Sequence, residues 1–195
     1  FVPSRGLGDV YKRQQLRRVV VTGLGTINPL GNTVETSWNS LISSNSGSSK
    51  INTFEVDDFP CKIAGSIDDS KINDDIVNLR EQRKIDRFIT LGLIAADEAI
   101  KDSGFVSENE SSFRYGVMVG SGIGGLDTIY RNSSILDNKG IKKISPFFIP
   151  SSLINLLSGH ISIKYNLKGP NSSPVTACAT GTHAIGDSFT IIKNN

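Results

Sequence analysis

Cysteine is scarce in this sequence, and the two cysteines present, Cys61 and Cys178, lie far apart. Neither belongs to a CxxC motif or to a Cys/His pattern with the spacing of metal ligands. The sequence therefore argues against a disulfide-stabilised scaffold and against a structural zinc site.

Long apolar runs and a strong excess of one charge are also missing. No apolar stretch approaches the roughly 20 residues that a helix needs to cross a bilayer, and the first residues lack the apolar stretch of a secretory signal. The 21 basic and 19 acidic side chains leave a net charge of +2, so no overall field favours nucleic acid. These absences predict a cytoplasmic protein that binds neither membrane nor nucleic acid.

Strand-like and helix-like segments alternate along the chain, which is typical of an α/β fold with a mainly parallel sheet. Strands are predicted at 17–21, 62–65 and 115–119, and the last unit, 173–181, is a short strand that turns sharply into a helix reaching Ile192. Helices are predicted to start at Asn32 or Thr33, to run from about Glu81 to Lys101, to start near Leu126, and to include Ile154, Leu156 and Leu157. Residues 1–14 have no apolar periodicity and are interpreted as a non-native or disordered leader, which leaves a domain over 15–195.

Cys178 has the most suggestive chemical setting in the chain, because small residues flank it at the predicted strand-to-helix turn. Such a turn exposes the sulfur, and the first N–H groups of the following helix favour the thiolate. The same N–H groups can stabilise the oxyanion that forms when a thioester is attacked. Acyl transfer is thus one interpretation, and a small buried structural cysteine is the other.

Five motifs, in their order and spacing, resemble the β-ketoacyl synthase family. They are VTGLGTINPLGN (21–32), REQRKIDRF (80–88), GSGIGG (120–125), KISPFFIPSS (143–152) and VTACATGTHAIGD (175–187). The resemblance extends from Arg17 to the end, and within the family it is to the bacterial type II elongating synthases. It implies a thiolase-like αβαβα layered fold, of which this chain supplies the N-terminal half and is truncated at the C-terminus.

The resemblance also implies a role for individual residues. Cys178 is the expected nucleophile, which accepts an acyl chain from acyl carrier protein. Ile123 and Phe148 are expected to line the acyl pocket at a homodimer interface, with Phe148 reaching in from the neighbouring subunit. The reaction needs no metal or organic cofactor, but its two histidines and lysine lie beyond this region. The chain as printed is therefore expected not to complete the condensation.

Basic residues cluster at the predicted start of the long helix, where positive charge opposes the helix dipole. The resemblance implies that Arg80, Arg83 and Lys84 dock the acidic acyl carrier protein, whereas an ordinary solvated surface is the alternative. Ile123 and Phe148 likewise have ordinary core packing as their alternative.

Two other functions remain open from the sequence. Gly120, Gly122 and Gly125 satisfy the GxGxxG pattern of a dinucleotide-binding oxidoreductase, although Asp137 does not follow a second apolar strand as ribose recognition requires. A non-catalytic chain-length partner subunit is the second, and the presence of Cys178 argues against it. His160 and His183 are interpreted as packing or hydrogen-bonding residues rather than as catalytic bases.

Overall fold

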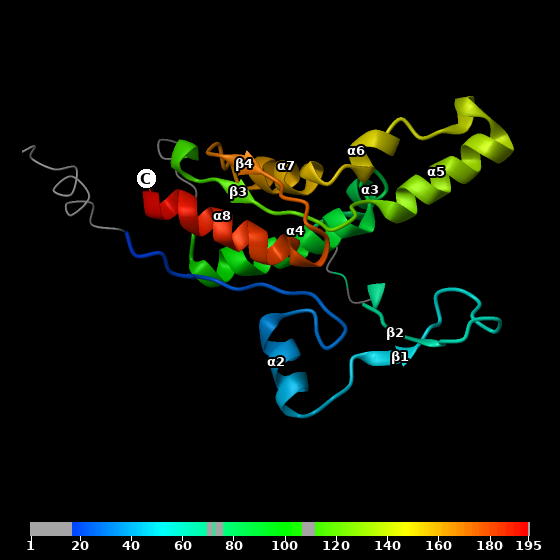
Figure 1. Ribbon diagram of the computed structural model, residues 1–195, viewed down its shortest axis with the longest axis horizontal. Coiled ribbons are helices and arrows are strands. Elements are labelled where there is room, and N and C mark those ends of the chain that lie inside the picture. Colours follow the sequence, from blue (N-terminus) through cyan, green and yellow to red (C-terminus); the bar gives the residue numbers. More distant parts are fainter. Residues whose placement is uncertain (1–16, 70–71, 73–75, 107–111, 195) are drawn as a thin grey trace, which may run out of the picture.

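The computed structural model describes residues 17–69, 72, 76–106 and 112–194, so the predicted leader at 1–14 lies outside the described residues. The chain forms helices joined by short strands and 3-10 turns (Figure 1). In chain order the elements are α2 (Val34–Ile42), β1 (Ser48–Lys50), β2 (Ile63–Gly65), α3 (Leu79–Gln82), α4 (Arg87–Ser103), η2 (Ser112–Arg114), β3 (Val117–Met118), α5 (Leu126–Lys139), η3 (Ile141–Lys143), α6 (Phe148–Ser152), α7 (Asn155–Lys164), β4 (Asn171–Ser172), η4 (Ala177–Ala179) and α8 (Thr180–Asn194).

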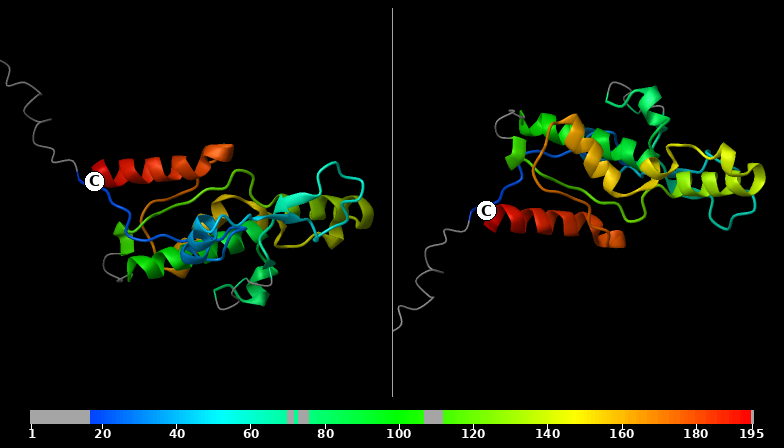
Figure 2. Two further views of the ribbon diagram at one scale, coloured as in Figure 1. Left: turned by 90° about the horizontal axis from the view of Figure 1, so that it is seen from below. Right: turned by 90° about the horizontal axis from the view of Figure 1, so that it is seen from above.

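The core is a helix–sheet–helix arrangement. β3 and β4 pair in parallel and lie between α8 on one side and α4 with α7 on the other (Figure 2). A cluster of buried apolar side chains fills the space between α4, α7 and β3, and it consists of Val77, Ile89, Leu93, Val117, Leu157, Ile161 and Leu167. Gly92 lets the two helices approach, because a Cβ atom at this position would come within 2.6 Å of both methyl carbons of Leu157.

The pairing of the strands refines the predicted sheet. β2 confirms the strand expected at 62–65, but it pairs antiparallel with β1 and stands apart from the parallel β3–β4 pair. The strand expected at 115–119 is confirmed in part as β3, whereas the strand of the last unit begins earlier, as β4.

The strand expected at 17–21 is not formed within the described residues, which was the clearest error. The segment has no regular secondary structure, and Val20 and Val21 are exposed, Val21 at 77%. The chain that follows this segment is hydrogen-bonded to α4 instead. Asp102 Oδ2 accepts the backbone N–H of Leu24 at 2.9 Å, and Glu98 Oε2 accepts that of Thr26 at 2.9 Å.

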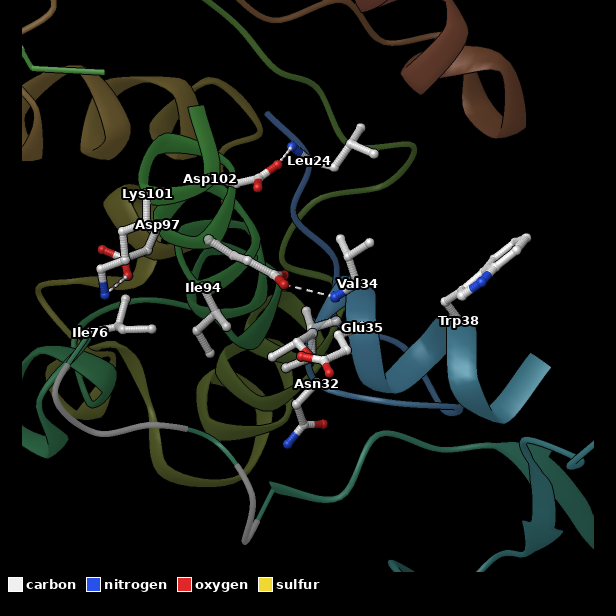
Figure 3. Close-up of a pocket in the computed structure, with 13 residues that line it drawn as sticks. Leu24, Asn32, Val34, Glu35, Trp38, Ile76, Ile94, Asp97, Lys101 and Asp102 are labelled. Atoms are coloured by element: carbon white, nitrogen blue, oxygen red, sulfur yellow. Dashed lines mark hydrogen bonds and ion pairs between the residues drawn. The ribbon is translucent and has the colours of Figure 1, made fainter. Parts of the chain in front are cut away.

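The same acidic face of α4 also fixes the start of α2. Glu98 Oε1 accepts the N–H of Val34 at 2.7 Å, and Thr33 forms a capping box with Thr36, which settles Thr33 as the N-cap. A cleft of about 740 Å³ opens between α2, α4 and the N-terminal segment, with Trp38 on its rim (Figure 3). Two of the carboxylates that line this cleft, those of Glu98 and Asp102, thus accept backbone N–H groups.

The long helix expected from Glu81 to Lys101 is broken into α3 and α4. Asp86 causes the break, because its side chain accepts the N–H of Phe88 and acts as the N-cap of α4. A short polar side chain of this kind favours a cap over a helix interior. The predicted end is confirmed, since Gly104 caps α4 with a φ of 64°. None of the helices in the described part of the chain is long and apolar enough to span a membrane.

The candidate active site around Cys178

Cys178 lies in η4, at the turn where the chain leaves β4 and enters α8, and its side chain is exposed. The preceding residue, Ala177, has a φ of 49°. This is the left-handed region, which costs a non-glycine residue free energy and is frequent at functional sites. The exposure expected from the sequence is therefore observed, and the alternative of a buried structural cysteine is not.

Hydrogen bonds from one buried side chain hold this turn, which we call the cysteine turn (Thr176–Thr180). Thr180 Oγ1 donates to the carbonyl of Ala177 at 2.8 Å and accepts the N–H of Thr176 at 2.9 Å. The N–H of Ala179 donates to the carbonyl of Thr176 at 3.0 Å. The turn thus places Cys178 just before α8, whose first backbone N–H groups have no partner within the helix.

The GSGIGG segment, which we call the glycine loop (Gly120–Gly125), packs against the cysteine turn. A Cβ atom on Gly120 would collide with the carbonyl oxygen of Pro174, and one on Gly122 would lie 3.1 Å from the carbonyl oxygen of Ala177. Glycine is needed here because of this close approach of two backbones. The structure therefore brings the loop that carries Ile123, a side chain that is 66% exposed, to the cysteine turn.

The segment that carries Phe148 reaches the other end of the glycine loop. Phe148 is the first residue of α6 and is half-buried, and the last residue of α6, Ser152, accepts the N–H of Gly125 through its carbonyl at 3.0 Å. The glycine loop, which carries Ile123, thus contacts both the α6 segment that carries Phe148 and the cysteine turn.

Arg80, Arg83 and Lys84 lie on α3 and directly after it, and all three are exposed. Contrary to expectation, they do not oppose the dipole of a long helix, because α3 has four residues and ends before α4 begins. Lys84 Nζ lies 5.5 Å from the ring centroid of Phe147, so this basic surface borders the α6 segment. The nearby Arg87 is not part of this basic surface, since its guanidinium pairs with Asp69 at 2.6 Å.

The two histidines have partners of their own. His183 Nδ1 lies 3.3 Å from Thr176 Oγ1, and its Nε2 lies 3.2 Å from Asp187 Oδ2, both on the exposed side of α8. His160 lies in a smaller cavity between α3 and α7, where burial lowers its pKa and the nearby charge of Glu81 partly opposes that shift. These contacts agree with the hydrogen-bonding and packing roles expected for both.

Sequence reasoning missed the function of Asp86, which follows the basic residues 80–84. Its carboxylate accepts both the backbone N–H and the hydroxyl of Thr128, in the first turn of α5, at 3.1 and 2.6 Å. The available signal was an aspartate placed just before an apolar periodic run, which is a helix-start pattern. In a dinucleotide-binding protein the pyrophosphate would occupy this helix N-terminus. A carboxylate already occupies it here, so the GxGxxG interpretation fails.

Comparison with known proteins identifies the family. Residues 16–195 match the family model of the β-ketoacyl synthase N-terminal domain. A 3-oxoacyl-[acyl-carrier-protein] synthase 2 from Rhizobium meliloti (strain 1021) is 47% identical over 184 residues, which cover 91% of this chain and 44% of that protein. The corresponding synthase from Vibrio harveyi is 44% identical, over 90% of this chain and 42% of its own length.

Solved structures agree on the fold. A type II PKS acyl-carrier protein in complex with its ketosynthase bound to the hexaketide matches with a TM-score of 0.67 and 26% identity, over 92% of this chain and 47% of that one. A β-ketoacyl synthase from Burkholderia phymatum STM815 matches with a TM-score of 0.72 and 22% identity, over 90% and 43%. The α/β arrangement is therefore that of the N-terminal half of a thiolase-like ketosynthase. The chain spans less than half the length of the curated relatives it matches, and it belongs to the β-ketoacyl synthase family.

Proposed function

We propose that the whole protein is a β-ketoacyl-[acyl carrier protein] synthase of fatty-acid elongation, and that residues 15–195 form its N-terminal domain. The observation that carries the proposal is the exposed thiol of Cys178 after the strained residue Ala177, at the start of a long helix. Relatives of up to 47% identity named 3-oxoacyl-[acyl-carrier-protein] synthase 2 support it. This chemistry belongs in the cytoplasm and needs no metal or cofactor.

In the first half-reaction the Cys178 thiolate attacks the carbonyl carbon of an acyl thioester on the carrier protein. A new S–C bond forms, the carrier thiol leaves, and the acyl group stays on Cys178. The backbone N–H of Cys178 lies at the start of α8 and contributes to an oxyanion hole for the tetrahedral intermediate. The fixed cysteine turn keeps this N–H and the sulfur in one geometry.

In the second half-reaction malonyl-[acyl carrier protein] loses carbon dioxide, and the resulting enolate attacks the acyl carbon on Cys178. The new C–C bond forms as the thiolate of Cys178 leaves. The resemblance places the two histidines and the lysine that promote this step outside residues 15–195. Ile123 and Phe148 then line the apolar chain pocket, where burial stabilises the acyl group by about 0.8 kcal/mol per methylene. Phe148 reaches the pocket across a homodimer interface.

Acyl carrier protein is the proposed partner of Arg80, Arg83 and Lys84. The support is their exposure and their position beside the α6 segment, together with the similar ketosynthase solved in complex with an acyl-carrier protein. Arg83→Glu should raise the KM for the carrier substrate about fivefold at low salt, and less at high salt. Arg131→Glu is the matched control, because Arg131 is also exposed but pairs with Asp127 on α5. Equal effects of the two substitutions would contradict a specific docking surface.

The proposal is tested with protein expressed from its complete reading frame. Incubation with acyl- and malonyl-[acyl carrier protein] should yield the 3-oxoacyl product, and Cys178→Ala should abolish it. A folded wild-type protein that makes no product would favour the alternative, a non-catalytic chain-length partner subunit. The chain 1–195 alone should make no product, and product from it would overturn the assignment of the later steps to residues outside this region.

A further inference from the structure

Asp86 is a charged side chain that is only 7% exposed, and it lies where α4, α5 and the glycine loop meet. A buried carboxylate is costly unless hydrogen bonds satisfy both of its oxygens. Each oxygen of Asp86 has its own partners. Oδ1 accepts the N–H of Phe88 at 3.1 Å, whereas Oδ2 accepts from Thr128.

The contact with Thr128 serves α5 rather than α4. The N-cap position of α5 is Gly125, which has no side chain to accept the first N–H groups of the helix. Asp86 supplies this acceptor from another helix, by taking the backbone N–H of Thr128 at 3.1 Å and its hydroxyl at 2.6 Å. One carboxylate therefore caps two helices, and the second of them begins directly after the glycine loop.

The same carboxylate also limits the position of the glycine loop. A Cβ atom on Gly125 would lie 3.1 Å from Asp86 Oδ2 and 2.7 Å from the Cα atom of Ser152. The loop end is thus confined between Asp86 and α6. At the other end, Gly122 faces the backbone of Ala177 in the cysteine turn. The contact with Asp86 and the contact with the turn that carries Cys178 therefore lie in one six-residue segment.

We propose that Asp86, through Thr128, is a positioning residue that fixes the glycine loop against the cysteine turn and so sets the reactivity of Cys178. A helix cap for α4 alone needs only the bond to Phe88. The two bonds from Thr128 are the feature that such a local role leaves unexplained. The proposal deepens the proposed function, on which it rests, because Ile123 is carried by the same loop.

Matched substitutions separate positioning from stability. Thr128→Val removes the donor hydroxyl at nearly constant shape, and Thr128→Ser restores it. Asp86→Asn keeps an oxygen for Phe88 but turns an N–H group toward Thr128. Asn138→Ala is the control on the same helix, because Asn138 hydrogen-bonds Ser134 instead of Asp86 or Thr128.

The first measurement is the rate of alkylation of Cys178 by iodoacetamide relative to that of Cys61 in the same molecule, by peptide mass spectrometry on the complete protein. Both thiols are exposed, so Cys61 corrects for reagent and for general loosening. We expect Thr128→Val and Asp86→Asn to change the ratio by about threefold or more, because small displacements have large effects on a positioned reacting group. Thr128→Ser and Asn138→Ala should stay within about twofold of wild type.

The second measurement is acylation by acyl-[acyl carrier protein], in which Thr128→Val should lower kcat and leave KM unchanged. If Thr128→Val and Asp86→Asn lower only the melting temperature, with ratio and kcat as in wild type, the positioning proposal is overturned while the proposed function stands. If wild type forms no acyl adduct but the two variants still change the alkylation ratio, the proposed function fails and the positioning of Cys178 is supported.

Discussion

The helices on the two sides of the β3–β4 pair differ in how much apolar surface they bury. On one side, α4 and α7 enclose Ile89, Leu93 and Leu157 and complete a core with the sheet. On the other side, α8 leaves Ile185 and other large apolar side chains exposed. The first region buries its apolar side chains within the chain itself. The second region, which carries Cys178, presents apolar surface of the kind that marks an interface, and the proposed homodimer and the remainder of the protein would cover it.

Matched isoleucine truncations should give the largest difference between the two regions. Ile89 is 0% exposed and Ile185 is 71% exposed. Ile89→Ala should lower the free energy of unfolding by about 3 kcal/mol, because it leaves a cavity between α4 and α7. Ile185→Ala should change it by less than about 0.5 kcal/mol. Urea unfolding of chain 1–195 measures both, and equal losses would show that α8 is as well packed as α4.

Removal of an ionic contact should also lower the free energy of unfolding more on α4 than on α8. On α4, Asp97 is buried, accepts the phenol of Tyr165 at 2.6 Å and pairs with Lys101 at 2.6 Å. Asp97→Asn should cost about 2 kcal/mol at pH 7. On α8, Asp187 forms an exposed pair with His183, and Asp187→Asn should cost less than about 0.5 kcal/mol.

The lowered pKa of Asp97 predicts how the stability loss in Asp97→Asn depends on pH. Burial by itself raises the pKa of Asp97, but hydrogen bonds from Lys101 and Tyr165 and the charges of Lys101 and Lys164 lower it below 3.8 overall. A carboxyl group with a lowered folded-state pKa stabilises the protein above its unfolded pKa, and this contribution is lost as the pH falls through the folded value. The deficit of Asp97→Asn should therefore shrink below about pH 4. A deficit that stays constant down to pH 2 would contradict the ionic explanation.

Glycine substitutions should give the smallest contrast. Gly104 ends α4 with a φ of 64°, and Gly186 lies inside α8, with open space around the position of a Cβ atom in both cases. Gly104→Ala should cost about 1 kcal/mol because of backbone strain. Gly186→Ala should stabilise the chain by up to about 1 kcal/mol through helix propensity. Thermal unfolding of the two variants measures the difference, and a loss in both would indicate that α8 packs against something at Gly186.

The sequence predicted elements best where local chemistry decides them. The Thr33 cap, the end of α4 at Gly104 and the helix after Cys178 follow from side chains near in sequence. Prediction from the sequence failed where contacts between residues far apart in the chain determine the structure. The exposed segment at 17–21 has strand-forming residues but no strand partner among the described residues, and the bonds that hold the chain beyond it come from Glu98 and Asp102.

The candidate site shows the same division. The exposure of Cys178 could be predicted from the small residues and the turn around it. The function of Asp86 could not, because its partner Thr128 lies 42 residues away and the cap that it replaces belongs to another helix. The basic residues 80–84 were identified, but their position relative to a long helix was wrong, since the break at Asp86 separates α3 from α4.

The most direct test of the account is to locate the acyl group. Protein from the complete reading frame is incubated with acyl carrier protein that bears a long acyl chain, and the adduct is mapped by intact and peptide mass spectrometry beside a Cys178→Ala control. The account predicts one acyl group on Cys178, none on Cys61, and no adduct in the control. A folded protein that remains unacylated, or an adduct that persists in the control, would contradict the assignment of Cys178 as the nucleophile.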